Sequence, residues 1–205
     1  MLTTEFLEIA SAICPDRPAV IFEGRKTSFS ELSDRVQRLA VALRGLGVGP
    51  GDTVALIQVN TPHCIEAYFA SALLGAIYVP LNFRARPNEF EYMINTADAK
   101  VVLAGERYTA VVDGLRPQLT SVRHFVALDG PAEGWAHYDA MIDACESEFI
   151  FPDFPEEATT ILMYTAGTTG FPKGVMLHHG SFTSYVLNNV SPVETTVVPP
   201  SGVGR

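Results

Sequence analysis

Hydrophobic and polar positions follow two different periods along much of the chain. One period places apolar residues on a single face of a helix, at Leu32, Val36, Leu39, Ala40 and Leu43. The other is a nearly continuous apolar run of strand length, TVALIQV at residues 53–59, which is typical of a strand covered on both faces. We therefore expect helices that pack against a buried sheet.

The same alternation continues to about residue 145. Further strands are expected at 77–81, 100–105 and 124–129. Further helices are expected at 63–75, 87–97, 107–119 and, from a weaker pattern, 137–145. Because strand and helix alternate, the predicted fold is an α/β domain with a layered, mainly parallel sheet and helices on both faces.

Two elements are predicted before the first buried strand. Residues 1–20 indicate an amphipathic helix, because Glu5 and Glu8 interrupt the apolar stretch and no basic segment precedes it, unlike a signal peptide. Residues 19–29 predict a hairpin. Ser30 is then the expected N-cap of the following helix.

The alternation breaks at residues 146–158, which hold two prolines and several acidic residues and predict a surface connection. We expect a first α/β subdomain at 1–158 and the start of an incomplete second subdomain at 159–205. Within the second part, residues 174–179 predict a strand and residues 181–190 a short helix.

Composition narrows the class of function. The chain has 205 residues, 47% of them hydrophobic and 18% charged, which is typical of a folded protein. Its net charge of −9, its pI near 4.9 and the lack of a basic cluster argue against a nucleic-acid partner. No apolar run in the sequence is long enough for a transmembrane segment. Three widely spaced cysteines favour reduced thiols and a cytoplasmic location.

The sequence TTILMYTAGTTGFPKGVMLHHG, residues 159–180, places flexible and hydroxyl-bearing residues directly after an apolar run. Gly167 and Gly170 allow successive backbone N–H groups to converge on one point. Thr165, Thr168 and Thr169 add hydroxyl donors, and Lys173 adds a mobile positive charge. This set predicts a cradle for polyphosphate.

The two common nucleotide patterns do not fit this loop. Counted from Gly167, the pattern GxxxxGK[ST] would require a glycine where Pro172 stands, and a serine or threonine in place of Gly174. The dinucleotide pattern GxGxxG is absent from the loop as well. Neither an ordinary P-loop nor a Rossmann site is therefore expected.

The whole run LMYTAGTTGFPKG instead resembles the phosphate-loop signature of the adenylate-forming (AMP-binding) superfamily, which includes acyl-CoA synthetases. The segments FSELSDRVQRLAVALRGLGVGPGDTVAL and GAIYVPLNFRARPNEFEYMINTADAKVVL resemble the same family, and the second is closer to its acyl-CoA synthetases (fatty-acid–CoA ligases). The resemblance covers about residues 5–190. Many relatives have Ser or Thr where this chain has Ala166.

The resemblance implies an AMP-forming acyl-CoA synthetase, which joins a carboxylic acid to coenzyme A through an acyl-adenylate. It implies ATP, Mg²⁺ and coenzyme A, a fatty or aromatic acid as substrate, and no transmembrane segment. The implied residues around the β and γ phosphates are Thr165, Ala166, Gly167, Thr168, Thr169, Gly170 and Lys173. The loop is expected to be exposed, from about Met163 to about Val175, between two strands.

Family members are more than twice this length, and their separate catalytic lysine has no counterpart in this chain. No catalytic residue is therefore assigned. The chain is interpreted as an N-terminal fragment that is inactive alone. The alternative is a stand-alone nucleotide-binding or regulatory module without ligase activity.

The histidines receive no catalytic role from the sequence. His178 and His179 lie at the end of a predicted strand, where a structural role is favoured over metal binding, and no metal ligand is assigned. Elsewhere His63 and two others are scattered without a pattern.

Overall fold

The computed structural model describes residues 1–165 and 170–189, and within them the predicted helices and strands are present. Their order is α1 (Thr3–Ile13), β1 (Pro18–Phe22), β2 (Arg25–Ser28), α2 (Phe29–Gly45), β3 (Thr53–Ile57), α3 (Pro62–Leu73), β4 (Ile77–Pro80), α4 (Pro87–Thr96), β5 (Ala99–Ala104), α5 (Glu106–Leu115), the 3₁₀ turn η1 (Arg116–Gln118), β6 (His124–Ala127), β7 (Ala136–His137), α6 (Tyr138–Asp143), β8 (Thr159–Thr165), β9 (Lys173–His178) and α7 (His179–Asn189).

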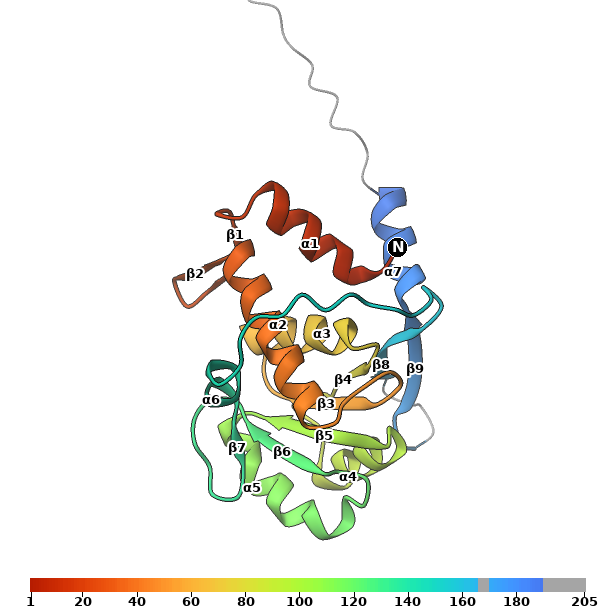
Figure 1. Ribbon diagram of the computed structural model, residues 1–205. Coiled ribbons are helices and arrows are strands. Elements are labelled where there is room, and N and C mark those ends of the chain that lie inside the picture. Colours follow the sequence, from red (N-terminus) through yellow and green to blue (C-terminus); the bar gives the residue numbers. More distant parts are fainter. Residues whose placement is uncertain (166–169, 190–205) are drawn as a thin grey trace, which may run out of the picture.

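A sheet of seven described strands forms the centre of the molecule, in the order β7-β6-β5-β3-β4-β8-β9 (Figure 1). Neighbouring strands are parallel except for β8 and β9, which form an antiparallel pair. The hairpin β1–β2 is a separate two-stranded sheet. The predicted mainly parallel α/β sheet is thus confirmed.

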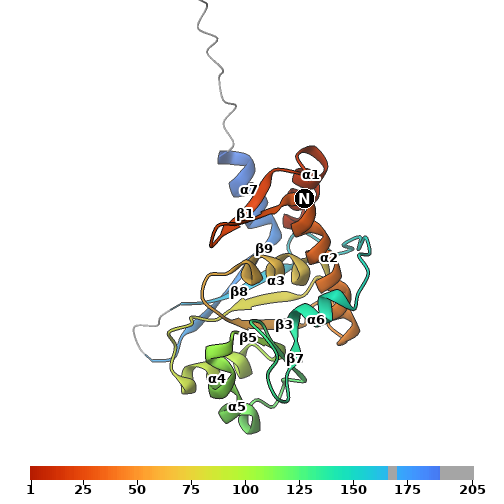
Figure 2. The ribbon, with the colours of Figure 1, turned by 90° about the vertical axis from the view of Figure 1, so that its left-hand side faces the viewer.

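Helices cover both faces of the sheet, and each face has its own core. Helices α2 and α3 lie on one side and α4 and α5 on the other, as Figures 1 and 2 show together. Alternate residues of β3 face the two sides: Val54 and Leu56 join the core under α2 and α3, while Ala55 and Ile57 join the core over α4 and α5. Every residue of β3 is therefore buried, which explains its continuous apolar run.

The start of α2 differs from the sequence prediction. Ser28, and not Ser30, is the N-cap: its hydroxyl accepts a hydrogen bond from the Glu31 backbone N–H at 3.2 Å. The Glu31 carboxylate in turn accepts from the Ser28 backbone N–H at 2.7 Å. This reciprocal pair is a capping box, and it starts the helix earlier than expected because it satisfies two terminal donors at once.

Other differences are small. The first buried strand ends at Ile57 rather than continuing to residue 59, because the chain turns toward α3. The two-residue strand β7, before α6, was not predicted. Strands β8 and β9 extend the same sheet as the rest, and the division of the chain after residue 158 stays a prediction.

Apolar side chains are exposed on β9 and α7. Val175 and Met176 are exposed on the strand, and Tyr185 and Leu187 on the helix. In the described part of the chain, no helix is long and apolar enough to cross a membrane.

Candidate functional site

The predicted phosphate loop connects β8 to β9 at one edge of the sheet. Because β8 runs parallel to β4, Thr165 lies at the edge where the parallel strands have their carboxyl ends. This is the edge at which α/β sheets usually bind ligands. Lys173, the first residue of the antiparallel strand β9, lies at the same edge.

Strand pairing brings Thr165 and Lys173 opposite each other. The Thr165 hydroxyl donates a hydrogen bond to the Lys173 backbone carbonyl at 3.4 Å, and both residues are exposed. None of the ion pairs between described residues involves Lys173. The side chain of Lys173 is open to solvent.

The structure places three of the seven predicted site residues. Thr165, Gly170 and Lys173 are described, and Gly170 has a φ of +133°, a conformation that favours glycine. The other four, Ala166, Gly167, Thr168 and Thr169, lie outside the described residues. The strands extend further than predicted: β8 continues through Thr165 and β9 begins at Lys173, so the connection is shorter than Met163 to Val175.

A second group of polar residues lies at the carboxyl ends of β3 and β6. The Gln58 side-chain amide donates to both carboxylate oxygens of Asp129, at 2.9 and 3.0 Å. Asp129 also accepts from the Glu106 backbone N–H at 2.8 Å, at the start of α5. Gly105 leaves room for this arrangement, because a Cβ there would lie 2.5 Å from the Gln58 side chain. These hydrogen bonds pair the polar groups of Gln58 and Asp129 and the backbone N–H of Glu106, and they hold this edge of the sheet in place.

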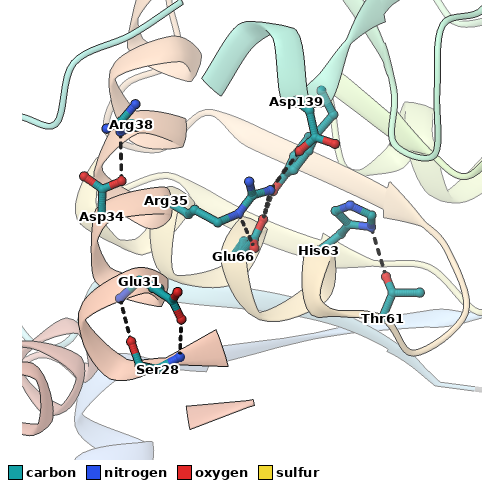
Figure 3. A network of polar contacts seen from close by, with 10 residues as sticks. Ser28, Glu31, Asp34, Arg35, Arg38, Thr61, His63, Glu66 and Asp139 are labelled. Atoms are coloured by element: carbon teal, nitrogen blue, oxygen red, sulfur yellow. Dashed lines mark hydrogen bonds and ion pairs between the residues drawn. The ribbon is translucent and has the colours of Figure 1, made fainter. Parts of the chain in front are cut away.

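A cavity of about 560 Å³ adjoins this edge, between the β1–β2 hairpin and the starts of α3 and α6. On its wall, Arg35 is held by a bidentate contact with Glu66, at 2.7 and 3.1 Å, and by Asp139 at 2.9 Å (Figure 3). Tyr138 donates to Glu66 at 2.9 Å. The carboxylate of Glu66 raises the pKa of the Arg35 guanidinium, and burial raises the pKa of the Tyr138 hydroxyl.

The same cavity contains His63, which received no role from the sequence. Its Nδ1 lies 3.2 Å from the Thr61 hydroxyl (Figure 3). Its ring packs edge-on against Tyr138, with 4.9 Å between the ring centroids. Burial lowers the pKa of His63, so the neutral imidazole is favoured. No local sequence pattern indicated this cluster, because its members come from distant segments of the chain.

His179 lies at the start of α7 and contacts the N-terminal helix. Its Nδ1 accepts from the Thr3 backbone N–H at 3.3 Å and lies 3.0 Å from the Thr3 hydroxyl, which itself accepts from Tyr68 at 2.7 Å. The ring is fully buried, and burial lowers the pKa of His179 to about 4. His179 therefore joins α1 to α7, in keeping with the structural role favoured from the sequence.

Metal ligands are not grouped in the part of the chain that the structure describes. Within residues 1–165 and 170–189, no three or more His, Cys, Asp or Glu side chains are arranged to hold a metal ion. Two carboxylates of the cavity, Glu66 and Asp139, instead bind Arg35.

Comparisons with known proteins agree with the geometry. The family model described as AMP-binding enzyme matches residues 7–200. The indoleacetate–CoA ligase of Aromatoleum aromaticum is 32% identical over 193 residues, which cover 93% of this chain and 37% of that protein. The long-chain-fatty-acid–CoA ligase of Thermus thermophilus is 37% identical over 188 residues, which cover 89% of this chain and 34% of that protein.

A solved structure shares the fold. The anthranilate CoA ligase AuaEII in complex with anthranoyl-AMP has a TM-score of 0.88 at 26% identity, over 91% of this chain and 36% of that one. The chain thus spans about a third of the length of the relatives it matches.

Proposed function

The chain belongs to the AMP-binding enzyme family, and we propose that it is part of an AMP-forming carboxylate–CoA ligase. In that enzyme it would supply the residues that bind the polyphosphate of ATP. In the first step a carboxylate oxygen attacks the α-phosphorus of ATP, and pyrophosphate leaves. In the second step the thiol of coenzyme A attacks the acyl carbon, and AMP leaves.

The observation that carries the proposal is the position of Thr165 and Lys173. They face each other at the carboxyl edge of the sheet, and the glycine- and threonine-rich segment lies between them in the sequence. A departing pyrophosphate gains negative charge, so fixed donors and a cation at this place stabilise the transition state. We assign the β and γ phosphates to the predicted set, Thr165, Ala166, Gly167, Thr168, Thr169, Gly170 and Lys173.

Three further components of the proposed reaction, Mg²⁺, coenzyme A and the acid, are those that the family implies. Magnesium would arrive with the phosphates of ATP, because phosphate oxygens are among its preferred ligands. Coenzyme A would be the thiol substrate. The acid is a small carboxylic acid, fatty or aromatic, as the names of the indoleacetate and long-chain-fatty-acid ligases suggest.

The proposal also covers the division of the chain into subdomains and the location of the reaction in the cell. The polyphosphate site would open a second subdomain at residues 159–205, after a first subdomain at residues 1–158. The reaction would take place in the cytoplasm, where Cys14, Cys64 and Cys145, all free thiols here, stay reduced.

ATP–pyrophosphate exchange tests the proposal. Residues 1–189 would replace the matching segment of the Thermus thermophilus ligase, and exchange would be measured with fatty and aromatic acids. We expect exchange by this chimera, and a loss of about a hundredfold in Lys173→Ala, as for removal of one stabilising group from an active site. Lys26→Ala, which removes an exposed lysine from β2, is the matched control. Unchanged exchange in Lys173→Ala would remove Lys173 from the site.

The isolated 205-residue chain distinguishes the ligase from the alternative module. We expect it to form no acyl-CoA from ATP, magnesium, coenzyme A and an acid, since it spans about a third of the related ligases. Misplacement of a reacting group by about 1 Å can cost about a hundredfold in rate, so an incomplete set of groups should not turn over. Acyl-CoA at turnover-level yield would contradict this expectation. ATP binding combined with an inactive chimera would favour a nucleotide-binding module.

A further inference from the structure

Helix α4 contacts the chain on both sides of the phosphate loop. On the β9 side, the Phe171 ring stacks on the Tyr92 ring of α4, with centroids 4.5 Å apart and planes 23° from parallel. Phe171 lies two residues before Lys173 and is otherwise half exposed, at 52%. Without this contact, a side chain so exposed would sample many rotamers. The stack therefore restrains the chain segment that leads into Lys173.

On the β8 side, Tyr164 reaches the same helix. Its hydroxyl donates to the Met93 backbone carbonyl at 3.1 Å, one residue along α4 from Tyr92. The Tyr164 ring packs against the core that lies between the sheet and helices α4 and α5, and burial raises the pKa of its hydroxyl. Tyr164 directly precedes Thr165, so this contact fixes the other end of the loop.

Gly174 makes the arrangement possible. It pairs with Tyr164 across the two strands, and it has no side chain. A Cβ at this position would lie 2.9 Å from Leu162 Cδ1 and 3.5 Å from Tyr164 Cε1. The side chains of β8 therefore occupy the space beside Gly174, and the Tyr164 ring extends to α4.

We propose that Tyr92, Tyr164 and Phe171, here called the α4 anchor, are positioning residues for polyphosphate binding. The inference rests on the proposed function of the loop. Two contacts with consecutive residues of one helix fix both ends of the loop, and thereby hold Thr165 and Lys173 in register before the anion arrives. Loop ends that are fixed in advance lose less conformational entropy on binding, so the affinity for the anion is higher.

Titration of the 205-residue chain with inorganic tripolyphosphate, followed by calorimetry, tests the anchor. Tyr92→Leu and Phe171→Leu each remove the stack and keep an apolar side chain. An aromatic pair of this kind accounts for about a two- to tenfold change in an equilibrium constant, and we expect affinity to fall by that factor. The double variant should bind no more weakly than either single variant, because each already removes the same contact.

Control variants separate positioning from general stability. Tyr92→Phe keeps the ring and should bind as the wild type does. Phe151→Leu removes an exposed aromatic residue, 80% exposed, that takes part in none of the aromatic pairs of the described chain. It should also leave affinity unchanged. The melting temperature of each variant reports whether it is folded.

Each outcome decides one of the two proposals. Wild-type affinity in both leucine variants, or additive losses in the double variant, would overturn the anchor and leave the proposed function intact. No saturable binding by the wild-type chain would overturn the proposed function. In that case NMR contacts between the Tyr92 and Phe171 rings still decide whether the loop end is fixed on α4, and their absence would overturn the anchor.

Discussion

Glu66→Gln is the perturbation whose effect the structure defines best. Glu66 is 3% exposed and accepts three hydrogen bonds, two from Arg35 and one from Tyr138. The amide has almost the same shape but no charge, and its NH₂ group would face donors. Breaking a buried ion pair on one side costs about 3–5 kcal/mol. Arg35 is 28% exposed and keeps Asp139, so we expect about 2–3 kcal/mol here.

For a chain of this size, that loss corresponds to a melting temperature lower by about 4–12 °C. Thermal unfolding of the 205-residue chain, followed by circular dichroism, measures it, and urea unfolding with an unchanged m-value confirms that only stability has changed. Glu148→Gln breaks the exposed pair between Arg44 and Glu148 and is the matched control, expected to leave the melting temperature almost unchanged.

A second variant tests the cause of the loss. Arg35→Met combined with Glu66→Leu removes both charges, and should be more stable than Glu66→Gln because no buried charge is left without its partner. Equal melting temperatures for Glu66→Gln and Glu148→Gln, or a double variant much less stable than Glu66→Gln, would refute this reasoning.

Three further predictions concern pH, backbone strain and the loop. The folded-state pKa of His179, about 4, lies below its ordinary value of 6.5, so the unfolded state binds a proton more readily. The free energy of unfolding should therefore decrease as the pH falls from about 6.5 to about 4, by about 3 kcal/mol over the whole range. His179→Asn keeps an acceptor for Thr3, and its stability should depend less on pH; equal dependence in urea titrations would contradict the assignment. Gly75→Ala should destabilise the folded chain by at least about 1–2 kcal/mol, because the φ of Gly75 is +65° and a Cβ there would lie 2.9 Å from Phe154. Adding Phe154→Ala to this variant should relieve only the contact and not the backbone strain. An unchanged urea midpoint in Gly75→Ala would be evidence against strain. Lys173→Ala should leave the melting temperature unchanged, since its side chain is exposed; a clear decrease would indicate a structural role.

Most of the fold could be predicted because its pattern is local. The run TVALI is apolar at every position after Thr53, and the structure buries it between two layers of helices. The spacing of Leu32, Val36 and Leu39 likewise gave the buried face of α2. The N-cap was misplaced at Ser30, although Ser28 and Glu31 have the S-x-x-E spacing of a capping box. Both Ser28 and Ser30 precede the acidic first turn, but only Ser28 makes the reciprocal contacts with Glu31.

The side-chain clusters could not be predicted, because they depend on pairs that are distant in the sequence. Arg35, Glu66 and Asp139 come from three helices, and only the folded chain brings them together. The stack of Phe171 on Tyr92 is of the same kind. For the loop, sequence chemistry predicted the type of ligand, and the strand register added the position of Lys173 opposite Thr165.

Titration of the 205-residue chain with tripolyphosphate, compared between wild type, Lys173→Ala and Lys26→Ala, tests the central claim most directly. A charge-assisted hydrogen bond contributes about 1.5–3 kcal/mol, so Lys173→Ala should weaken binding by about ten- to a hundredfold. Wild type and Lys26→Ala should bind equally and saturably. Equal affinity in Lys173→Ala and Lys26→Ala, or no saturable binding by the wild type, would contradict the assignment of the loop to polyphosphate.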